Sequence, residues 1–300
     1  MKIVYSERFL EHETGEGHPE SPQRLIAIMK YLKEKELPVS FDKPLEINER
    51  ELYIVHDEEY IERLKFLSDM QQGGGDNPFS TNTFKIAKLA AGAALKAARN
   101  SEKGFSFALV RPPGHHAGRN SFGGFCYLNN IAFAVASLLQ SEVKKAMIVD
   151  IDQHHGNGTQ DIFHNDERVF YLSFHQDPNT CFPWTSGFES ENNEHIRNVV
   201  IAPETKDGEY LKIFTGNFLK YSSEFKPQLI GVSVGFDTFY KDYCCGNAID
   251  IEDSATYNKI GSMIKKQAEK LGARTFAVLE GGYYLETLGE NFWSFCSAFL

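Results

Sequence analysis

Residues 146–158 read AMIVDIDQHHGNG. The first part is a short, mostly apolar run, which is typical of a buried strand, and the second part is polar and glycine-rich, which favours a loop. Further runs of this kind, rich in β-branched or aromatic residues, predict strands at 2–5, 107–110, 146–151, 169–174, 199–202, 229–236 and 276–279.

Helical patterns lie between the predicted strands, at 21–35, 83–99, 127–139, 208–225 and 253–271. Strands that alternate with helices predict an open, mainly parallel sheet with helices on both faces, the α/β class. The only compositionally biased patch, QQGGGDNP at 71–78, is short enough to be a loop. We therefore expect residues 1–300 to form a single α/β domain.

Length and composition limit the function classes. The 300 residues are 42% hydrophobic and 24% charged, with a mean hydropathy of −0.36, which is typical of a globular protein. No apolar run approaches the roughly 18 residues of a membrane helix, and the N-terminal residues lack a secretory apolar segment. We expect a cytoplasmic protein that does not bind membranes.

The charge balance limits the classes of binding partner, and the cysteines indicate the redox state of the thiols. The net charge of −10 argues against direct nucleic-acid binding and is compatible with a cationic substrate. The five cysteines are odd in number and include no CxxC pair, so we expect reduced thiols.

A metal site is predicted where polar residues follow the strands, because ligands of open α/β sheets bind beyond the carboxyl ends of the strands. Asp150, Asp152 and His154 alternate, which would place them on one side of an extended segment. Asp152 and His154 could share one ion with Asp237, the first polar residue after 229–236. Two carboxylates and one imidazole suit catalytic zinc, which keeps a position open. Each aspartate alone could instead be a cap or turn residue.

Two histidines are candidates for proton transfer. His115 and His116 follow a Pro-Pro-Gly turn, and Asp150 could accept a hydrogen bond from one of them. That carboxylate would raise the pKa of its partner, whereas a histidine held by neutral Asn157 would stay available as a base. Tyr283, after two glycines, is a candidate donor to a developing oxyanion.

These motifs together, in order, resemble the histone deacetylase and acetylpolyamine amidohydrolase family, on the branch that is similar to class II. The motifs are GHPESPQR (17–24), RPPGHHA (111–117), GFCYLNN (124–130), DIDQHHGNGTQDIF (150–163), SFHQDP (173–178), GFDTF (235–239) and EGGY (280–283). The resemblance implies the arginase/deacetylase fold and a zinc-dependent amidohydrolase, with iron as an alternative metal, that removes an acetyl or other short acyl group from an amine.

The resemblance also implies roles for individual residues. Asp152, His154 and Asp237 match the zinc ligands, His115 and His116 the tandem catalytic histidines, and Tyr283 the residue that polarises the acetyl carbonyl. In the implied mechanism, His116 takes a proton from water and His115 helps to protonate the leaving amine. The other matching residues are Gly124, Phe125 and Phe182 in the substrate tunnel, Arg24 near the acetate exit, and Asp150, Asp152, His154, Ser173 and Phe174 at a structural potassium site.

Two departures from the family pattern leave the substrate open. Asn157 stands where another branch of the family has aspartate, and residues 242–246 read DYCCG instead of an Asp-Pro-Leu-Gly-Gly type loop. Acetyl-lysine in proteins is the favoured substrate, and acetylated polyamine is the alternative. Candidate rim carboxylates are Asp76, Asp177 and Asp242, and the roles of Cys244 and Cys245 and the oligomeric state stay open.

Three rival interpretations rank lower. Residues 231–235, GVSVG, fit the nucleophile elbow of serine hydrolases, but apolar residues continue past Ser233 where the elbow needs a turn into a helix. A two-manganese ureohydrolase on the same fold would need more aspartates and has no place for the histidine pair. A non-catalytic acyl-amine binding module would not need every candidate catalytic residue to be present.

Overall fold

The computed structural model describes residues 1–242, 244 and 249–300. Eight strands form one sheet in the order β2-β1-β3-β8-β7-β4-β5-β6. All neighbouring strands are parallel, which confirms the predicted sheet. The strands are β1 Lys2–Val4, β2 Ser40–Asp42, β3 Ser106–Ala108, β4 Ala146–Asp150, β5 Val169–Gln176, β6 Ile196–Ile201, β7 Leu229–Val234 and β8 Arg274–Leu279.

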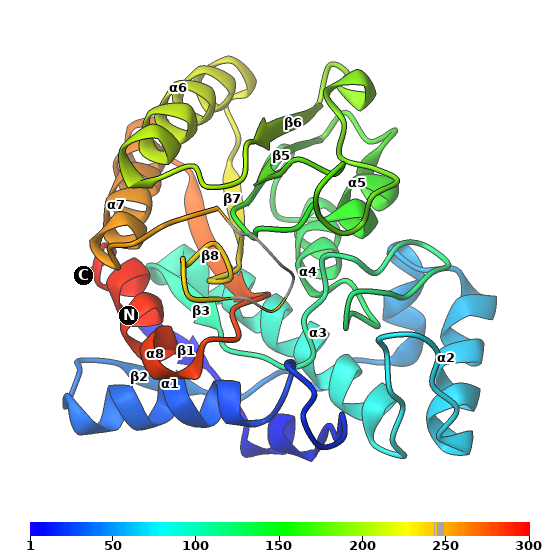
Figure 1. Cartoon of the computed structure of the whole chain (residues 1–300). Helices are drawn as coiled ribbons and strands as arrows, with labels where there is room; N and C mark the ends of the chain where they lie inside the picture. Colours follow the sequence, from blue (N-terminus) through cyan, green and yellow to red (C-terminus); the bar gives the residue numbers. More distant parts are fainter. Residues whose placement is uncertain (243, 245–248) are drawn as a thin grey trace.

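Helices cover both faces of the sheet (Figure 1). On one face α3 packs against α4 and the central strands, and on the other α6, α7 and α8 follow one another, with α1 against α8. The α-helices are α1 Gln23–Glu34, α2 Glu58–Met70, α3 Thr83–Asn100, α4 Asn130–Leu139, α5 Asn157–Phe163, α6 Asp207–Phe225, α7 Ala255–Leu271 and α8 Leu285–Ser297.

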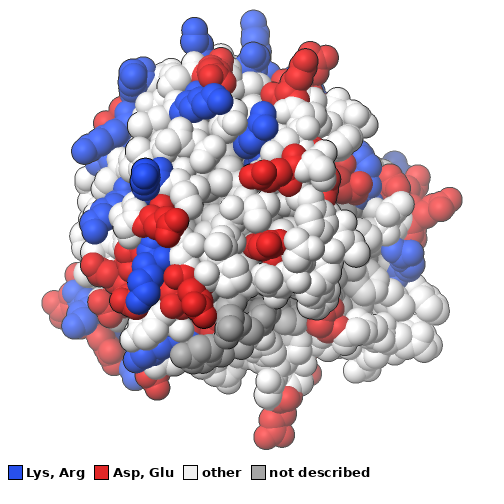
Figure 2. Space-filling view, turned by 45° about the horizontal axis from the view of Figure 1, so that its top comes forward, with Lys and Arg blue, Asp and Glu red and all other residues white. Residues whose placement is uncertain are grey.

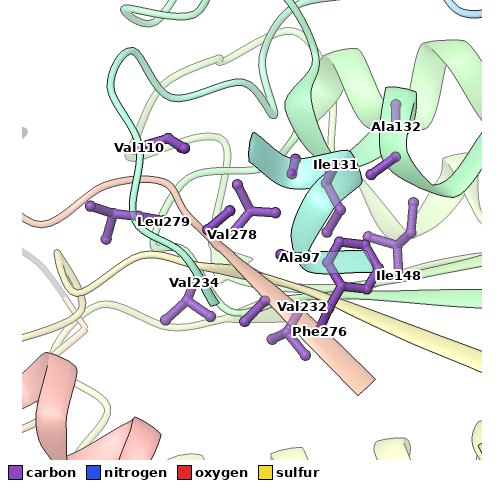
Figure 3. Close-up of a cluster of buried hydrophobic side chains, with 14 of the residues drawn as sticks. Ala97, Val110, Ile131, Ala132, Ile148, Val232, Val234, Phe276, Val278 and Leu279 are labelled. Carbon is purple, nitrogen blue, oxygen red and sulfur yellow. The ribbon is translucent and has the colours of Figure 1, made fainter. Parts of the chain in front are cut away.

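The hydrophobic core lies between the central strands and the helices (Figure 3). Gly231 of β7 pairs with Ile148 of β4 and with Phe276 of β8. A Cβ atom at Gly231 would lie 3.0 Å from the Phe276 ring and 3.3 Å from Ile131 of α4. The missing side chain therefore makes room for the ring, and this close packing positions the three strands that lead to the polar edge.

Several boundaries differ from the predicted ones for identifiable reasons. The helix predicted at 127–139 begins at Asn130, because the side chain of Asn129 caps it by accepting a hydrogen bond from the Ala132 N–H. The strand β2, only three residues long, and the helices α2, α5 and α8 were not predicted. For α2 a signal was present: Asp57 precedes a helix that buries Tyr60, Ile61 and Leu64 on one face.

The surface carries charges of both signs (Figure 2). On the face that Figure 2 shows, Lys and Arg are interspersed with Asp and Glu, so the net charge of −10 is not gathered in one patch there. None of the described helices is both long enough and apolar enough to span a bilayer.

A buried ion cluster ties the N-terminal segment to the sheet. Glu20 is fully buried and accepts hydrogen bonds from Arg111 Nε at 2.6 Å, Arg111 Nη2 at 2.8 Å and Arg24 Nη1 at 3.1 Å. Burial alone would raise the pKa of the Glu20 carboxyl, but the charges of Arg111 and Arg24 outweigh it and lower that pKa to about 2. The cluster is therefore ionised at neutral pH.

Replacing Glu20 with glutamine should lower the free energy of unfolding by about 3–5 kcal/mol, because two buried guanidinium groups would lose their counter-charge. Urea denaturation measures the effect. The matched control is Asp166→Asn, which breaks the exposed Asp166–Arg168 pair at 2.7 Å and should cost less than about 1 kcal/mol. Equal costs for the two variants would contradict a structural role for the buried cluster.

Candidate active site

Three metal-ligating side chains meet at the carboxyl edge of the sheet. Asp152 and His154 follow β4, and Asp237 follows β7. His154 Nδ1 lies 3.2 Å from Asp152 Oδ1 and 3.0 Å from Asp237 Oδ2, and one ligand atom from each residue falls within 4.8 Å of the others. All three residues are buried. The predicted trio is thus assembled from two adjacent strands.

The electrostatics of the trio fit a bound cation. Burial and the negative charge of Asp152 raise the pKa of Asp237. For Asp152 itself, His115 and His154 outweigh burial and lower the pKa. Two buried carboxylates this close together repel each other, and a divalent ion would offset that repulsion. An Asp2His set suits zinc or another first-row metal.

Two glycines leave room for the carboxylates of the trio. A Cβ atom at Gly235 would lie 2.1 Å from Asp152 Oδ2, and one at Gly281 would lie 2.3 Å from Asp237 Oδ2. Any larger residue at either position would therefore press on a candidate metal ligand. The glycine of the GFD motif and the first glycine of EGGY thus have a steric explanation.

The segment that carries Asp152 and His154 is bent, whereas an extended segment was expected. Strand β4 ends at Asp150. Asp150 Oδ1 then accepts a hydrogen bond from the Asp152 N–H at 3.1 Å, and Asp152 Oδ1 accepts one from the His154 N–H at 2.9 Å. Aspartates that bond the backbone two residues ahead favour turns. The three residues therefore lie close together, as expected, but the backbone turns that follow β4 bring them together and not an extended segment.

The two adjacent histidines have different partners. His115 Nδ1 lies 3.1 Å from Asp150 Oδ2, and His116 Nδ1 lies 2.8 Å from Asn157 Oδ1. For His115, burial favours the neutral ring, but the charges of Asp152 and Asp150 outweigh it and raise the pKa to about 10. For His116, burial and the neighbouring His115 and His154 hold the pKa well below its ordinary value. The two adjacent rings therefore differ in protonation, with a raised pKa for His115 and a lowered pKa for His116.

The hydrogen bond of His116 also selects its tautomer. Asn157 Oδ1 can only accept, so neutral His116 carries its proton on Nδ1. The lone pair of Nε2 is then available for a proton from a reacting group. His116 Nε2 belongs to a ring that lines the cavity described below.

Three residues without a predicted role support this histidine pair. Glu280 Oε2 accepts hydrogen bonds from the N–H groups of Gly114 at 2.6 Å and His115 at 3.1 Å. Glu280 Oε1 accepts one from Ser233 Oγ at 3.0 Å, and the Tyr171 hydroxyl donates to Asp150 Oδ2 at 3.0 Å. Ser233 lies inside strand β7, which excludes the sharp turn of a nucleophile elbow.

Tyr283 is held by contacts on both sides. The Arg24 guanidinium lies 4.8 Å from the centre of its ring. Asp242, only 3% exposed, accepts hydrogen bonds from the N–H groups of Tyr283 and Tyr284. Asp242 is therefore not a rim carboxylate, because it is buried and its carboxylate binds the backbone N–H groups of the tyrosine loop. Burial outweighs the charge of Arg24 and raises the pKa of Tyr283 well above its ordinary value.

Arg24 is fully buried and bonded to the backbone of the same loop. Its Nε donates to the Gly282 carbonyl at 2.7 Å, and its Nη2 donates to the Glu280 carbonyl. Together with the bond to Glu20, these contacts engage every nitrogen of the guanidinium. The acetate exit near Arg24 stays a prediction.

A cavity of about 230 Å³ leads to the site. Gly124, Phe125 and Phe182 line it, as predicted for a tunnel. Gly124 has φ +53°, and a Cβ atom there would lie 2.3 Å from His116 Cδ2, so only glycine fits beside the histidine. The described residues around the cavity are Asp76, His116, Gly124, Phe125, His154, Phe182, Trp184, Cys244 and Tyr283.

The candidate rim residues and the candidate potassium-site residues lie in different parts of the structure. Asp177 does not line the cavity in the described part of the chain, whereas Asp76 and Cys244 do. Cys245 lies outside the described residues. Ser173 of β5 is the register partner of Asp150, and its Oγ lies 2.8 Å from His175 Nδ1. Phe174 follows it in β5, and the potassium site stays a prediction.

An open parallel α/β sheet that gathers a carboxylate–imidazole trio and a histidine pair at its carboxyl edge has the layout of a hydrolytic enzyme. Residues 18–299 match the family profile of the histone deacetylase domain, and the chain belongs to this family.

Individual relatives agree with the family match. The chain is 36% identical over 299 residues to a probable deacetylase from Archaeoglobus fulgidus, covering 95% of this chain and 81% of the relative. The crystal structure of the HDA15 HD domain is 30% identical, with a TM-score of 0.92, over 100% of this chain and 90% of that one. That of acetylpolyamine aminohydrolase from Burkholderia pseudomallei is 25% identical, with a TM-score of 0.87, over 100% and 98%. The protein is thus a deacetylase of the histone deacetylase family.

Proposed function

We propose that residues 1–300 form one metal-dependent deacetylase domain that hydrolyses the amide of acetyl-lysine in proteins. One observation carries the proposal: two adjacent histidines with opposite pKa shifts lie beside the Asp152, His154 and Asp237 trio, at the floor of a cavity with phenylalanine walls. The phenylalanine walls suit the aliphatic stem of a lysine, and the polar floor suits its acetamide.

The metal that best suits the trio is zinc, with iron as the alternative. When bound, the divalent ion would polarise the acetyl carbonyl and lower the pKa of a water molecule. Asp152, His154 and Asp237 would hold it. A structural potassium ion near Asp150 and Ser173 is part of the same proposal.

The protein residues supply the proton transfers. His116 Nε2 accepts the proton of the attacking water, and Tyr283 donates a hydrogen bond to the acetyl oxygen as negative charge develops on it. His115, kept protonated by Asp150, gives a proton to the leaving nitrogen. Water and amide are thereby converted into acetate and a free amine.

Steady-state rates on an acetyl-lysine peptide, N-acetylputrescine and N-acetylspermidine, each with and without a chelator, test the proposal. Faster, chelator-sensitive hydrolysis of the peptide would support it. Preference for the small amines would favour the acetylpolyamine alternative, which the similarity to acetylpolyamine aminohydrolase supports. Binding of these amides without chelator-sensitive hydrolysis would contradict both and favour a non-catalytic module.

Replacing Asn157 with aspartate tests the assignment of His116. A carboxylate at 2.8 Å would stabilise the imidazolium and raise the pKa of His116. Because the base must be neutral, we expect the acid limb of kcat/KM to move to higher pH by about one unit or more. The pH profile measures this shift, with Asn179→Asp, on an exposed loop, as control. An unmoved limb would exclude His116 as the base.

A further inference from the structure

The mouth of the cavity has a different chemistry from its floor. His116 and His154, at the floor, are each 5% exposed, whereas Trp184 is 61% exposed and Asp76 is exposed as well. Asp76 is the only carboxylate among the described residues that line the cavity, and no lysine or arginine occurs among them. A group that protrudes from the tunnel therefore meets the exposed Trp184 indole and a negative charge.

Asp76 is held at this mouth by its neighbour Asn77, which is fully buried. The Asn77 side chain donates from Nδ2 to the Cys126 carbonyl at 3.0 Å and accepts from the Phe125 N–H at 3.2 Å. Gly74 and Asn77 also exchange backbone hydrogen bonds, which close a tight turn around Asp76. These bonds fix the Asp76 turn to the chain segment that supplies the Phe125 wall.

Trp184 is held by the other phenylalanine wall. Its ring lies edge-to-face against Phe182 at 5.4 Å, and Phe182 in turn lies edge-to-face against His116 at 4.9 Å. Trp184 has a φ of +57°, a conformation that side chains other than glycine adopt at a free-energy cost. A strained backbone that presents a largely exposed indole beside a reaction cavity points to recognition of a ligand.

Among charged ligands, a cation matches this mouth best. Tryptophan is the side chain that attracts cations most strongly through its ring face, and a nearby carboxylate adds direct charge attraction. The net charge of −10 would also favour the approach of cationic substrates. An anionic or purely apolar distal group would gain nothing from Asp76.

We infer that Trp184 and Asp76 form a subsite for a second cationic group of the substrate, an ammonium or guanidinium that lies beyond the acetylated amine. This inference rests on the proposed deacetylase function and deepens it. The cation has two possible sources: the free amine of a monoacetylated polyamine, or a basic residue next to acetyl-lysine in a peptide. Both present the same chemistry to the mouth of the tunnel.

Two matched substrate pairs separate the contribution of the cation. N-acetylputrescine is compared with N-pentylacetamide, in which a methyl group replaces the ammonium, and an acetyl-lysine peptide flanked by arginine is compared with one flanked by glutamine. In the metal-loaded wild type we expect kcat/KM to favour the cationic member of at least one pair by about threefold to tenfold. The substrate pair with the larger ratio of cationic to neutral kcat/KM identifies whether the cation comes from a polyamine or from a peptide.

The ratio should fall toward one in Trp184→Gly and in Asp76→Asn. Because each ratio compares two substrates in the same variant, a general change in activity does not alter it. Glycine tolerates the positive φ of position 184, so folding is not put at risk. Trp184→Phe should keep part of the preference. Phe66→Ala removes another exposed aromatic side chain, on α2, and should change nothing. A cation preference that is absent in wild type, or that survives in Trp184→Gly, would overturn the subsite.

A calorimetric titration keeps the subsite testable if no amide is hydrolysed. Putrescine, which carries two ammonium groups, is compared with n-pentylamine, which carries one. Tighter binding of putrescine that disappears in Trp184→Gly would support the subsite even if the proposed function failed. Equal binding of the two amines by the wild type would overturn the subsite while leaving deacetylation untouched.

Discussion

Replacing Tyr283 with phenylalanine should lower kcat on an acetylated amine by about 10²–10³ while leaving the metal content unchanged. The lost hydroxyl is the expected donor to the acetyl oxygen, and burial raises its pKa so far that it stays protonated at neutral pH. Phenylalanine keeps the ring that packs against Phe125 at 5.8 Å and under Arg24 at 4.8 Å. The loop should therefore keep its shape.

Single-turnover rates and elemental analysis of dialysed protein measure the two halves of this prediction. The matched control is Tyr284→Phe, because the neighbouring Tyr284 hydroxyl bonds Glu286 and its ring does not line the cavity. Tyr284→Phe should retain activity within about twofold, as is usual for a surface change away from the site. Full activity in Tyr283→Phe would remove the tyrosine from the mechanism.

Replacing Asp237 with asparagine should abolish metal retention and, with it, measurable deacetylation. The change removes one of two anionic ligands, so the loss in metal affinity should exceed the roughly 10–100-fold that loss of an outer hydrogen-bond partner costs. Asparagine has the same shape and can still accept the Gln153 N–H, which Asp237 Oδ1 accepts at 3.1 Å. Metal titration followed by assay measures both effects.

Without metal, Asp237→Asn should have a higher free energy of unfolding than wild type at neutral pH, although the same change weakens metal binding. Burial and Asp152 raise the pKa of Asp237, so the folded state holds this proton to a higher pH than the unfolded state does. As the pH rises above the ordinary carboxyl value, the unfolded state ionises first, and metal-free wild type loses up to about 1.4 kcal/mol per pH unit across that window. Asp237→Asn lacks this loss.

Urea denaturation in chelator from acid to neutral pH measures this difference. The advantage of Asp237→Asn over wild type should grow as the pH rises, and added zinc should then stabilise only the wild type. A constant difference between the two proteins would mean that Asp237 ionises normally. Asp237 could then still be a metal ligand, but repulsion from Asp152 would not affect its ionisation.

Much of the site follows from the sequence because of one property of parallel sheets. The residues after β3, β4, β7 and β8 converge at the same edge, so His115, Asp152, Asp237 and Tyr283 could be grouped before any coordinates were known. A carboxylate and a neutral amide, Asp150 and Asn157, could also be expected as partners of the histidines, but the sequence did not indicate which histidine each would contact.

The supporting contacts could not be predicted in the same way. Glu280 reaches back to Gly114 and Ser233, and Asp242 folds under the tyrosine loop. These bonds join segments that lie far apart in the sequence, and neither spacing nor composition indicates which carboxylates turn inward. The sequence therefore suggests Asp242 as a rim carboxylate, whereas the structure places it under the tyrosine loop. Trp184 carried only a weak signal, as one of two tryptophans in the chain.

The position of β8 has a consequence for how the enzyme is made. This strand lies between β3 and β7, so before residues 274–279 are synthesised the sheet exists only as two separate pieces, β2-β1-β3 and β7-β4-β5-β6. The histidine pair follows the first piece, and the candidate metal-ligating trio follows strands of the second. A growing chain can therefore bring the trio together before it brings the trio beside the histidine pair, because only β8 joins the two pieces into one sheet.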